Sequence, residues 1–143
     1  MQLFSHDDKA TALGRAPLFT NLSRADLVEL AKLTEDLEFE EGKVLAREGE
    51  LGHEFFVLVD GDVLVTKDGE EIRRLGPGDF FGEIALVWDS PRRTATVTAA
   101  TPVRFFVLTR QAFRSLIDHH PDIEEKVLKV LEERVRTTES GEI

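Results

Sequence analysis

The spacing of apolar residues divides this chain into a helical beginning, a central region of short apolar runs and a helical end. Residues from about 7 to 33 carry apolar side chains at helical spacing, with an interruption at Pro17. Ser23 and Asp26 form the pattern of a capping box, with aspartate in the place of glutamate. We therefore expect N-terminal helices over residues 7–33, one of which begins just after Ser23.

Between residues 34 and 109 the pattern is typical of strands. Short β-branched or aromatic runs alternate with turn signals, and eight of the ten glycines lie between Gly42 and Gly82. Asp68-Gly69 between two apolar runs is a strong signal for a hairpin. Short strands separated by regular turns favour an antiparallel sandwich or a jelly-roll barrel. Residues 37–40 alternate between apolar and acidic side chains, and the short runs are residues 55–59, 63–65 and 103–108.

The apolar spacing becomes helical again over residues 110–138. Phe113, Leu116 and Ile117 share one face of a first helix, and a second helix carries an apolar stripe over residues 123–135. Three interpretations of this stripe stay open. It is the face of an amphipathic helix lying on the barrel, a lid over a binding site, or a dimer seam.

Composition narrows the class of protein. A chain of 143 residues with 41% hydrophobic residues fits a single globular domain over residues 1–143. It has no cysteine and no apolar run approaching the ~20 residues that span a bilayer, so we expect a cytoplasmic protein without a membrane segment. The net charge of −10 argues against a general nucleic-acid binder. Any anion site must therefore be built from local donors.

The candidate chemistry lies in a glycine-rich stretch, residues 76–96. Residues 81–86 are expected to form a short helical turn, whose first amide groups favour an anion, and Gly82 allows a ligand close to the backbone. Arg93 offers a planar, charged fork for two phosphate oxygens. Glu83 can accept hydrogen bonds from a neighbouring hydroxyl. These groups suit a ribose phosphate, although an ion pair between Glu83 and Arg93 explains the same residues equally well.

Two segments of this stretch resemble the signature of the cyclic nucleotide-binding domain family. That signature reads Phe-Gly-Glu-hydrophobic-Ala-Leu, then a loop, then Arg-small-Ala-Thr/Ser-Val. The chain has Phe81-Gly82-Glu83-Ile84-Ala85-Leu86 and Arg93-Thr94-Ala95-Thr96-Val97. The resemblance covers nearly the whole chain. It implies a mainly β fold, an antiparallel jelly-roll β-barrel (double-stranded β-helix) over residues 34–109, with a phosphate-binding cassette at 81–96, N-terminal helices before it and two C-terminal helices over 110–138.

The resemblance also implies a role for each matching residue. Glu83 would hold the ribose 2′-hydroxyl, and Arg93 would hold the cyclic phosphate. Thr94 would add a hydroxyl to the phosphate or contact the guanine amino group of cGMP. The other implied ligand-binding residues are Gly82, Ile84 and Ala85 at the phosphate, Phe81 and Ala95 in the cassette, Val65 and Leu75 at the base, and Leu131 or Arg134, with Val127 and Val130, in the lid.

The expected function is that of a regulatory sensor domain that binds cAMP, or alternatively cGMP, and couples binding to movement of its C-terminal helix. We expect neither catalysis nor a metal or cofactor, because a jelly-roll metalloenzyme needs clustered histidines and no His-x-His is present. A homodimer or an effector domain is expected at the C-terminal helix, without direct contact to nucleic acid. Two alternatives are a degenerate domain that serves as a protein-interaction module, and the sensor fragment of a transcription regulator without its DNA-binding part.

Three positions depart from the family pattern. The loop at residues 87–92 is one residue longer than in several relatives, which leaves Arg92 as well as Arg93 a candidate for the phosphate contact. Only Arg93 directly precedes the small-Ala-Thr triplet. Arg73 falls where a relative carries an apolar base contact. The last helix has neither tyrosine nor tryptophan, so it cannot supply an aromatic lid.

Overall fold

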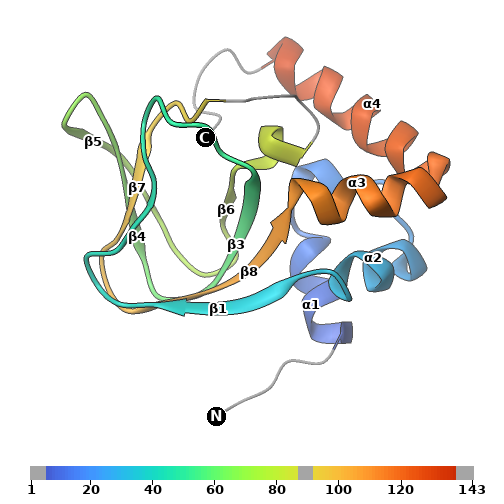
Figure 1. Cartoon of the computed structure of the whole chain (residues 1–143), viewed down its shortest axis with the longest axis horizontal. Helices are drawn as coiled ribbons and strands as arrows, with labels where there is room; N and C mark the ends of the chain where they lie inside the picture. Colours follow the sequence, from blue (N-terminus) through green and yellow to red (C-terminus); the bar gives the residue numbers. More distant parts are fainter. Residues whose placement is uncertain (1–5, 87–91, 138–143) are drawn as a thin grey trace.

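The chain forms a jelly roll of two antiparallel sheets, with the described helices gathered on one side of it (Figure 1). This computed structural model describes residues 6–86 and 92–137. The strand order is β1-β8-β3-β6 in one four-stranded sheet and β2-β7-β4-β5 in the other. The strands are β1 (Glu35–Phe39), β2 (Val44–Ala46), β3 (Glu54–Asp60), β4 (Val63–Lys67), β5 (Glu70–Leu75), β6 (Phe80–Phe81), β7 (Thr96–Ala99) and β8 (Val103–Thr109).

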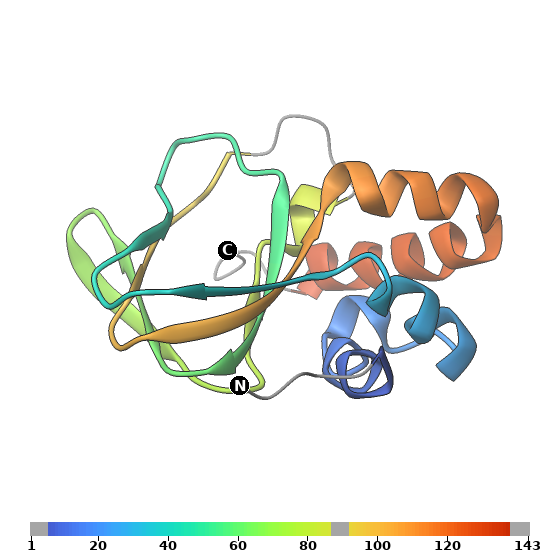
Figure 2. The same ribbon diagram turned by 60° about the horizontal axis from the view of Figure 1, so that its bottom comes forward.

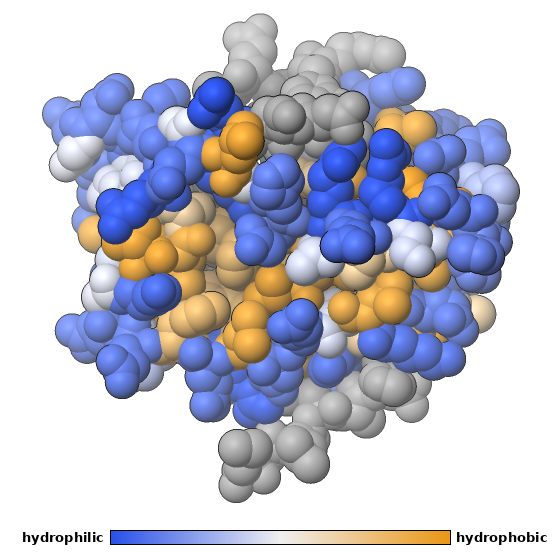
Figure 3. Space-filling model, in the orientation of Figure 1, coloured by the Kyte–Doolittle hydropathy of each residue, from blue (hydrophilic) through white to orange (hydrophobic). Residues whose placement is uncertain are grey.

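Apolar side chains fill the space between the two sheets. In β7, for example, Val97 and Ala99 turn inward at every second position, as the pleat of a strand requires. Phe56 and Phe81 stack with ring centroids 4.5 Å apart, and Phe105 meets them edge-on at 5.5 and 5.9 Å. Figure 3 shows apolar residues across the middle of the face seen in Figure 1, with hydrophilic residues around them. We call the buried set the barrel core: Ala46, Phe56, Leu58, Val63, Val65, Leu75, Phe81, Ala95, Val97, Ala99, Val103, Phe105 and Val107.

The helices from the two ends of the chain lie together beside the jelly roll (Figures 1 and 2). They are α1 (His6–Leu13), the 3₁₀ turn η1 (Pro17–Phe19), α2 (Arg24–Ala31), α3 (Arg110–His119) and α4 (Pro121–Thr137). None of the helices in the described part of the chain is long and apolar enough to cross a membrane.

A second cluster of buried residues joins these helices to the outer face of the sheet that contains β3 and β8. Within this helical core, Phe19 meets Phe55 edge-on at 5.6 Å and Phe113 at 6.2 Å. Ile123 and Val127 of α4 are fully buried in the same cluster. The first half of the apolar stripe on α4 is therefore buried among the helices and not in the barrel core.

The structure confirms the features that were predicted from a few neighbouring residues, namely the helix cap at Ser23 and the Asp68-Gly69 turn. Ser23 accepts a hydrogen bond from the Asp26 amide, and the Asp26 carboxylate accepts one from the Ser23 amide, which completes the capping box of α2. Asp68 and Gly69 have φ angles of 52° and 83°, as the two central residues of a hairpin turn of this kind require. The jelly roll and the two C-terminal helices are also confirmed.

One expectation needs correction. The strands between residues 34 and 109 hydrogen-bond into two separate sheets within the described chain, so the jelly roll is not one closed barrel. The N-terminal helices predicted over residues 7–33, with their interruption at Pro17, are confirmed as α1, η1 and α2. Pro17 occupies the first position of η1, where its missing N–H is not needed, and it cannot continue α1.

Candidate functional site

The turn that leads into the predicted cassette is hydrogen-bonded to β3. The Gly78 amide donates to the Leu58 carbonyl at 2.8 Å. After β6, Gly82 has a φ of 89°, which an L side chain rarely adopts, and the Ala85 amide donates to the Gly82 carbonyl at 3.1 Å. The chain thereby starts the short 3₁₀ helix η2 (Glu83–Leu86). The helical turn predicted over residues 81–86 is therefore confirmed for residues 83–86, whereas Phe81 belongs to strand β6.

The Arg93 guanidinium lies in a slot that two glycines leave open. Arg93 is only 7% exposed, and its Nη2 donates to the Glu54 carbonyl at 2.8 Å. A β-carbon at Gly52 would overlap the guanidinium, and one at Gly82 would lie 2.7 Å from its Nη1. Since neither glycine can gain a side chain without displacing Arg93, these backbones fix where the positive charge lies.

Backbone pairing determines which of the two neighbouring arginines points inward. The Arg93 amide donates to the Glu50 carbonyl at 2.8 Å, and the Gly49 amide donates to the Arg93 carbonyl at 2.8 Å. Leu51 forms an isolated bridge with Arg92, whose exposed guanidinium donates to the Gly49 carbonyl at 2.7 Å. Successive residues in extended backbone point to opposite sides, so Arg93 turns inward and Arg92 outward.

A cavity of about 170 Å³ lies in front of Arg93. Burial lowers the pKa of the Arg93 guanidinium, and the nearby Glu54 charge acts in the opposite direction. An incompletely hydrated cation beside a cavity favours an anion there. The cavity is lined by Val44, Leu45, Ala46, Arg47, Glu50, Leu51, Gly52, Glu54 and Arg93.

The predicted base residues lie on the inner face of the β4–β5 hairpin. Val65 and Leu75 are both buried in the barrel core. Arg73 lies directly opposite Val65 in the pairing register, and opposite residues of an antiparallel pair share a face. Arg73 therefore belongs to the inner face although its side chain is exposed. Arg74 belongs to the outer face, where its Nη2 lies 3.4 Å from the Asp62 carboxylate.

The family model of the cyclic nucleotide-binding domain matches residues 36–120. This chain belongs to that family. It is 33% identical over 134 residues to a CRP-like cAMP-activated global transcriptional regulator of Mycobacterium tuberculosis, covering 90% of this chain and 59% of the regulator. It is 38% identical over 118 residues to a cyclic nucleotide-gated potassium channel of Rhizobium etli, covering 82% of this chain and 33% of the channel. The N-terminal domain of a transcriptional regulator from Streptomyces coelicolor A3(2) has the same fold, with a TM-score of 0.79, 29% identity and coverage of 90% and 92%.

The structure describes most, but not all, of the residues that a cyclic nucleotide-binding domain is expected to use. Gly82 and Arg93 lie against each other, and Thr94 is exposed beside them in sequence. The predicted residues that are buried are Phe81, Ala85, Ala95, Val65 and Leu75, together with Val127 in the helical core and Val130 on α4. The side chains outside the described part are those of Glu83, Ile84, Leu131 and Arg134, so the Glu83 ion pair, the ribose contact and the lid stay predictions.

Sequence reasoning missed the two residues that contact the Arg93 guanidinium from the β3 side. Gly52 precedes β3 and Glu54 opens it, far from the cassette in sequence. Gly52 gives one signal, because a glycine just before a strand marks a possible close approach of backbone. Glu54 gives none, since an acidic residue at the edge of a strand is ordinary.

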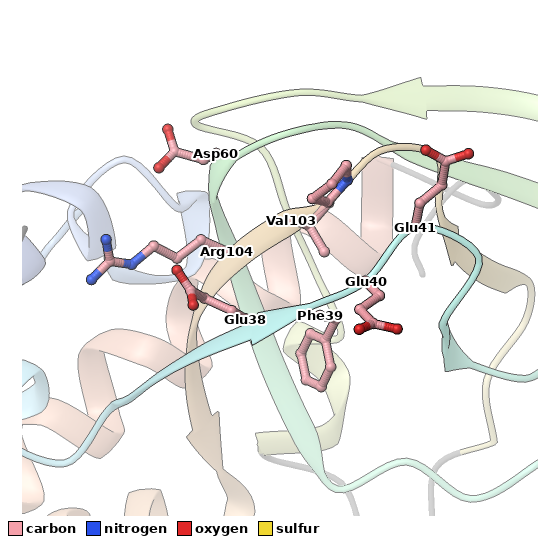
Figure 4. Close-up of a pocket in the computed structure, with 8 residues that line it drawn as sticks. Glu38, Phe39, Glu40, Glu41, Asp60, Val103 and Arg104 are labelled. Atoms are coloured by element: carbon pink, nitrogen blue, oxygen red, sulfur yellow. The ribbon is translucent and has the colours of Figure 1, made fainter. Parts of the chain in front are cut away.

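A larger cavity lies elsewhere, at the end of the sheet where β1 and β3 finish and β8 begins, and is unsuited to a cyclic phosphate. Its volume is about 450 Å³, and Figure 4 shows the carboxylates of Glu38, Glu40 and Glu41 around it, with Asp60 nearby. Arg104 also lines this cavity, but its Nε donates to the Asp36 carboxylate at 2.7 Å. The excess of negative charge repels anions, so the smaller cavity beside Arg93 is the better candidate site.

Proposed function

We propose that this chain is a regulatory domain that binds a cyclic nucleotide at the cassette and holds its phosphate with Arg93. The observation that carries the proposal is the buried Arg93 guanidinium, set between Gly52 and Gly82 beside the start of η2. A cation in this position binds an anion more strongly than an exposed one, because water competes less. Membership of the cyclic nucleotide-binding domain family supports a cyclic phosphate as that anion.

The remaining contacts are assigned from the family signature. In this proposal Glu83 accepts hydrogen bonds from the ribose 2′-hydroxyl, and Thr94 donates to the phosphate. Val65 and Leu75 form the apolar wall against the base. Their burial in the barrel core supports this assignment.

The proposed output is a change in how α4 packs. Contacts between neighbouring elements support this coupling between the cassette and α4, since η2 contacts α3, and α3 contacts α4. A ligand shifts this arrangement only as far as it binds one packing of α4 more tightly than another. The chain spans 59% of the Mycobacterium tuberculosis regulator and 33% of the Rhizobium etli channel, so the effector that α4 controls is a proposal too. One possibility is that the chain is the sensor part of a transcription regulator. The alternative is a domain that uses α4 only for protein contacts.

The identity of the base is proposed from Arg73. Guanine presents two acceptors, O6 and N7, on the edge that an arginine fork reads, whereas adenine presents one acceptor and one amino donor. An arginine on the inner face, opposite Val65, therefore favours cGMP over cAMP. The sequence alone made cAMP the expected ligand, and the register of β4 and β5 is the reason for this revision.

Calorimetry with cAMP and cGMP tests the proposed function. We expect micromolar or tighter binding to the wild type, and a loss of about 2–5 kcal/mol in Arg93→Leu, because the phosphate then lacks its buried partner. Arg92→Leu is the matched control, since it removes the same charge from an exposed side chain next in sequence. Binding that is lost in Arg92→Leu and kept in Arg93→Leu would assign the phosphate to the other arginine. If the wild type binds neither nucleotide at high micromolar concentration, the domain acts by protein contacts alone.

A further inference from the structure

The Glu54 side chain lies at the open end of the slot that holds Arg93. Its Oε1 is 3.8 Å from Arg93 Nη2, too far for a good hydrogen bond but close enough for an ion pair. The Glu54 side chain is 48% exposed, whereas that of Arg93 is 6% exposed. The carboxylate thus faces solvent on one side and the buried cation on the other.

The same carboxylate makes a second, weaker contact. Its Oε1 accepts a hydrogen bond from the His53 amide at 3.4 Å, near the upper limit for such a bond. The firm contact between Glu54 and Arg93 is made by the Glu54 backbone, whose carbonyl accepts from Arg93 Nη2 at 2.8 Å. Arg93 therefore keeps its position through the backbone of Glu54, and the carboxylate is not needed to orient it.

The carboxylate and a bound phosphate would use the same cation. Glu54 and Arg93 line one cavity of about 170 Å³, so an anion that enters it comes close to the Glu54 charge. Each of these anions offsets the desolvation of the guanidinium, and each gains less when the other is present. Two negative charges a few ångströms apart repel strongly in a partly buried site.

We propose that the Glu54 carboxylate is an internal competitor of the ligand phosphate and thereby lowers the affinity of the Arg93 site. This inference rests on the proposed function, because it concerns a phosphate bound at Arg93. It adds a residue outside the cassette that sets how tightly the domain binds its nucleotide. Removing the charge strengthens binding if Glu54 competes with the phosphate, and weakens binding if Glu54 positions the arginine.

Calorimetry with cAMP and with cGMP on Glu54→Gln and Glu54→Ala tests this inference. We expect both variants to bind the nucleotide about tenfold more tightly than the wild type, the effect of removing one close like charge. Two variants are needed because a glutamine amide can donate to phosphate and alanine cannot. Glu41→Gln is the control, because this substitution removes the same unit of net charge from an exposed residue that lines the larger, acidic cavity and not the Arg93 site.

The possible results separate this inference from the proposed function. Tighter binding in both Glu54 variants than in the wild type, with Glu41→Gln unchanged, supports the competition. Unchanged or weaker binding in the Glu54 variants overturns it and leaves wild-type binding intact as evidence for the function. A gain in Glu54→Gln alone overturns it as well, since the gain then comes from a new hydrogen bond. If the wild type and both variants bind neither nucleotide, both proposals are wrong. Thermal melts of each variant confirm that the fold is kept.

Discussion

Single residues at this site act through their position on one face of a strand or another. Arg73 and Arg74 are neighbours with the same charge, yet β5 presents the first beside Val65 and the second toward Asp62. A register shift between Val65 and Thr66 sets this arrangement, because it leaves one extra residue on β5. The proposed base contact therefore depends on a bulge as much as on the arginine itself.

We expect Arg73→Leu to change the base preference and Arg74→Leu to leave it unchanged. In the wild type, cGMP should bind more tightly than cAMP by about 1–3 kcal/mol, the discrimination of one good two-pronged base contact. Arg73→Leu should reduce the ratio of the two dissociation constants toward one, mainly by weakening cGMP. Titration of both nucleotides into the three proteins measures this ratio. A ratio that is the same in the wild type and in Arg73→Leu would remove Arg73 from the base site.

At the scale of whole elements, the start of α2 is the best-defined helix end in the described part of the chain. The Ser23 hydroxyl accepts from the Asp26 amide at 3.1 Å, and the Asp26 carboxylate accepts from the Ser23 amide at 3.2 Å. Asp26 also accepts from Lys126 of α4 at 3.3 Å. The cap that starts α2 thus also holds the carboxylate that joins α2 to the last helix.

Replacing this cap should destabilise the domain measurably. We expect Ser23→Ala to lower the free energy of unfolding by about 1 kcal/mol, because the Asp26 amide loses its acceptor. Urea denaturation at neutral pH measures the change in midpoint. Ser115→Ala is the control, since Ser115 is exposed within α3 and alanine favours the helix interior. Equal losses in the two variants would mean that the cap contributes nothing specific.

The elements that the sequence predicted are those that short-range rules determine. The capping box, the Asp68-Gly69 turn and the helical turn at residues 83–86 each depend on a few neighbouring residues. The slot around Arg93 was not predictable in this way, because Gly52 contacts the guanidinium only after β3 and the cassette come together. The division into two sheets is also tertiary, since periodicity tells which residues face inward but not which strands pair.

For the molecule as a whole, pairs of charges join parts of the chain that are distant in sequence. Asp36 of β1 and Arg104 of β8 form a two-pronged ion pair, and Arg104 is 12% exposed. The hydrogen bonds from Arg104 hold the pKa of Asp36 below its usual range, against the effect of burial. In a chain of net charge −10, such fixed pairs matter because the remaining carboxylates repel one another.

This pair predicts how stability depends on pH. The pKa of Asp36 is lower in the folded chain than its ordinary value of 3.8, so its stabilising effect is complete well above pH 4 and is lost as the pH falls through the folded pKa. We expect Asp36→Asn to lower the free energy of unfolding by about 1.5–3 kcal/mol at pH 6, the range for a hydrogen bond to a charged group. The difference from the wild type should shrink as the pH falls below 3.8 and through the folded pKa, and it should approach zero once both states of the wild type bind the proton.

Denaturant titrations of the wild type and Asp36→Asn, from pH 7 down through the pH range in which the carboxylates become protonated, give this difference directly. Taking the difference also cancels the relief of general repulsion, which acts on both proteins as the carboxylates become protonated. Glu35→Gln, an exposed change on the same strand, should show a small difference that does not depend on pH in this way. If the Asp36→Asn difference stays constant until the carboxylates of the folded protein are protonated, the ionised carboxylate is not what stabilises the contact of β1 with β8. Its disappearance in that range would assign the stabilisation to the charge and not to packing.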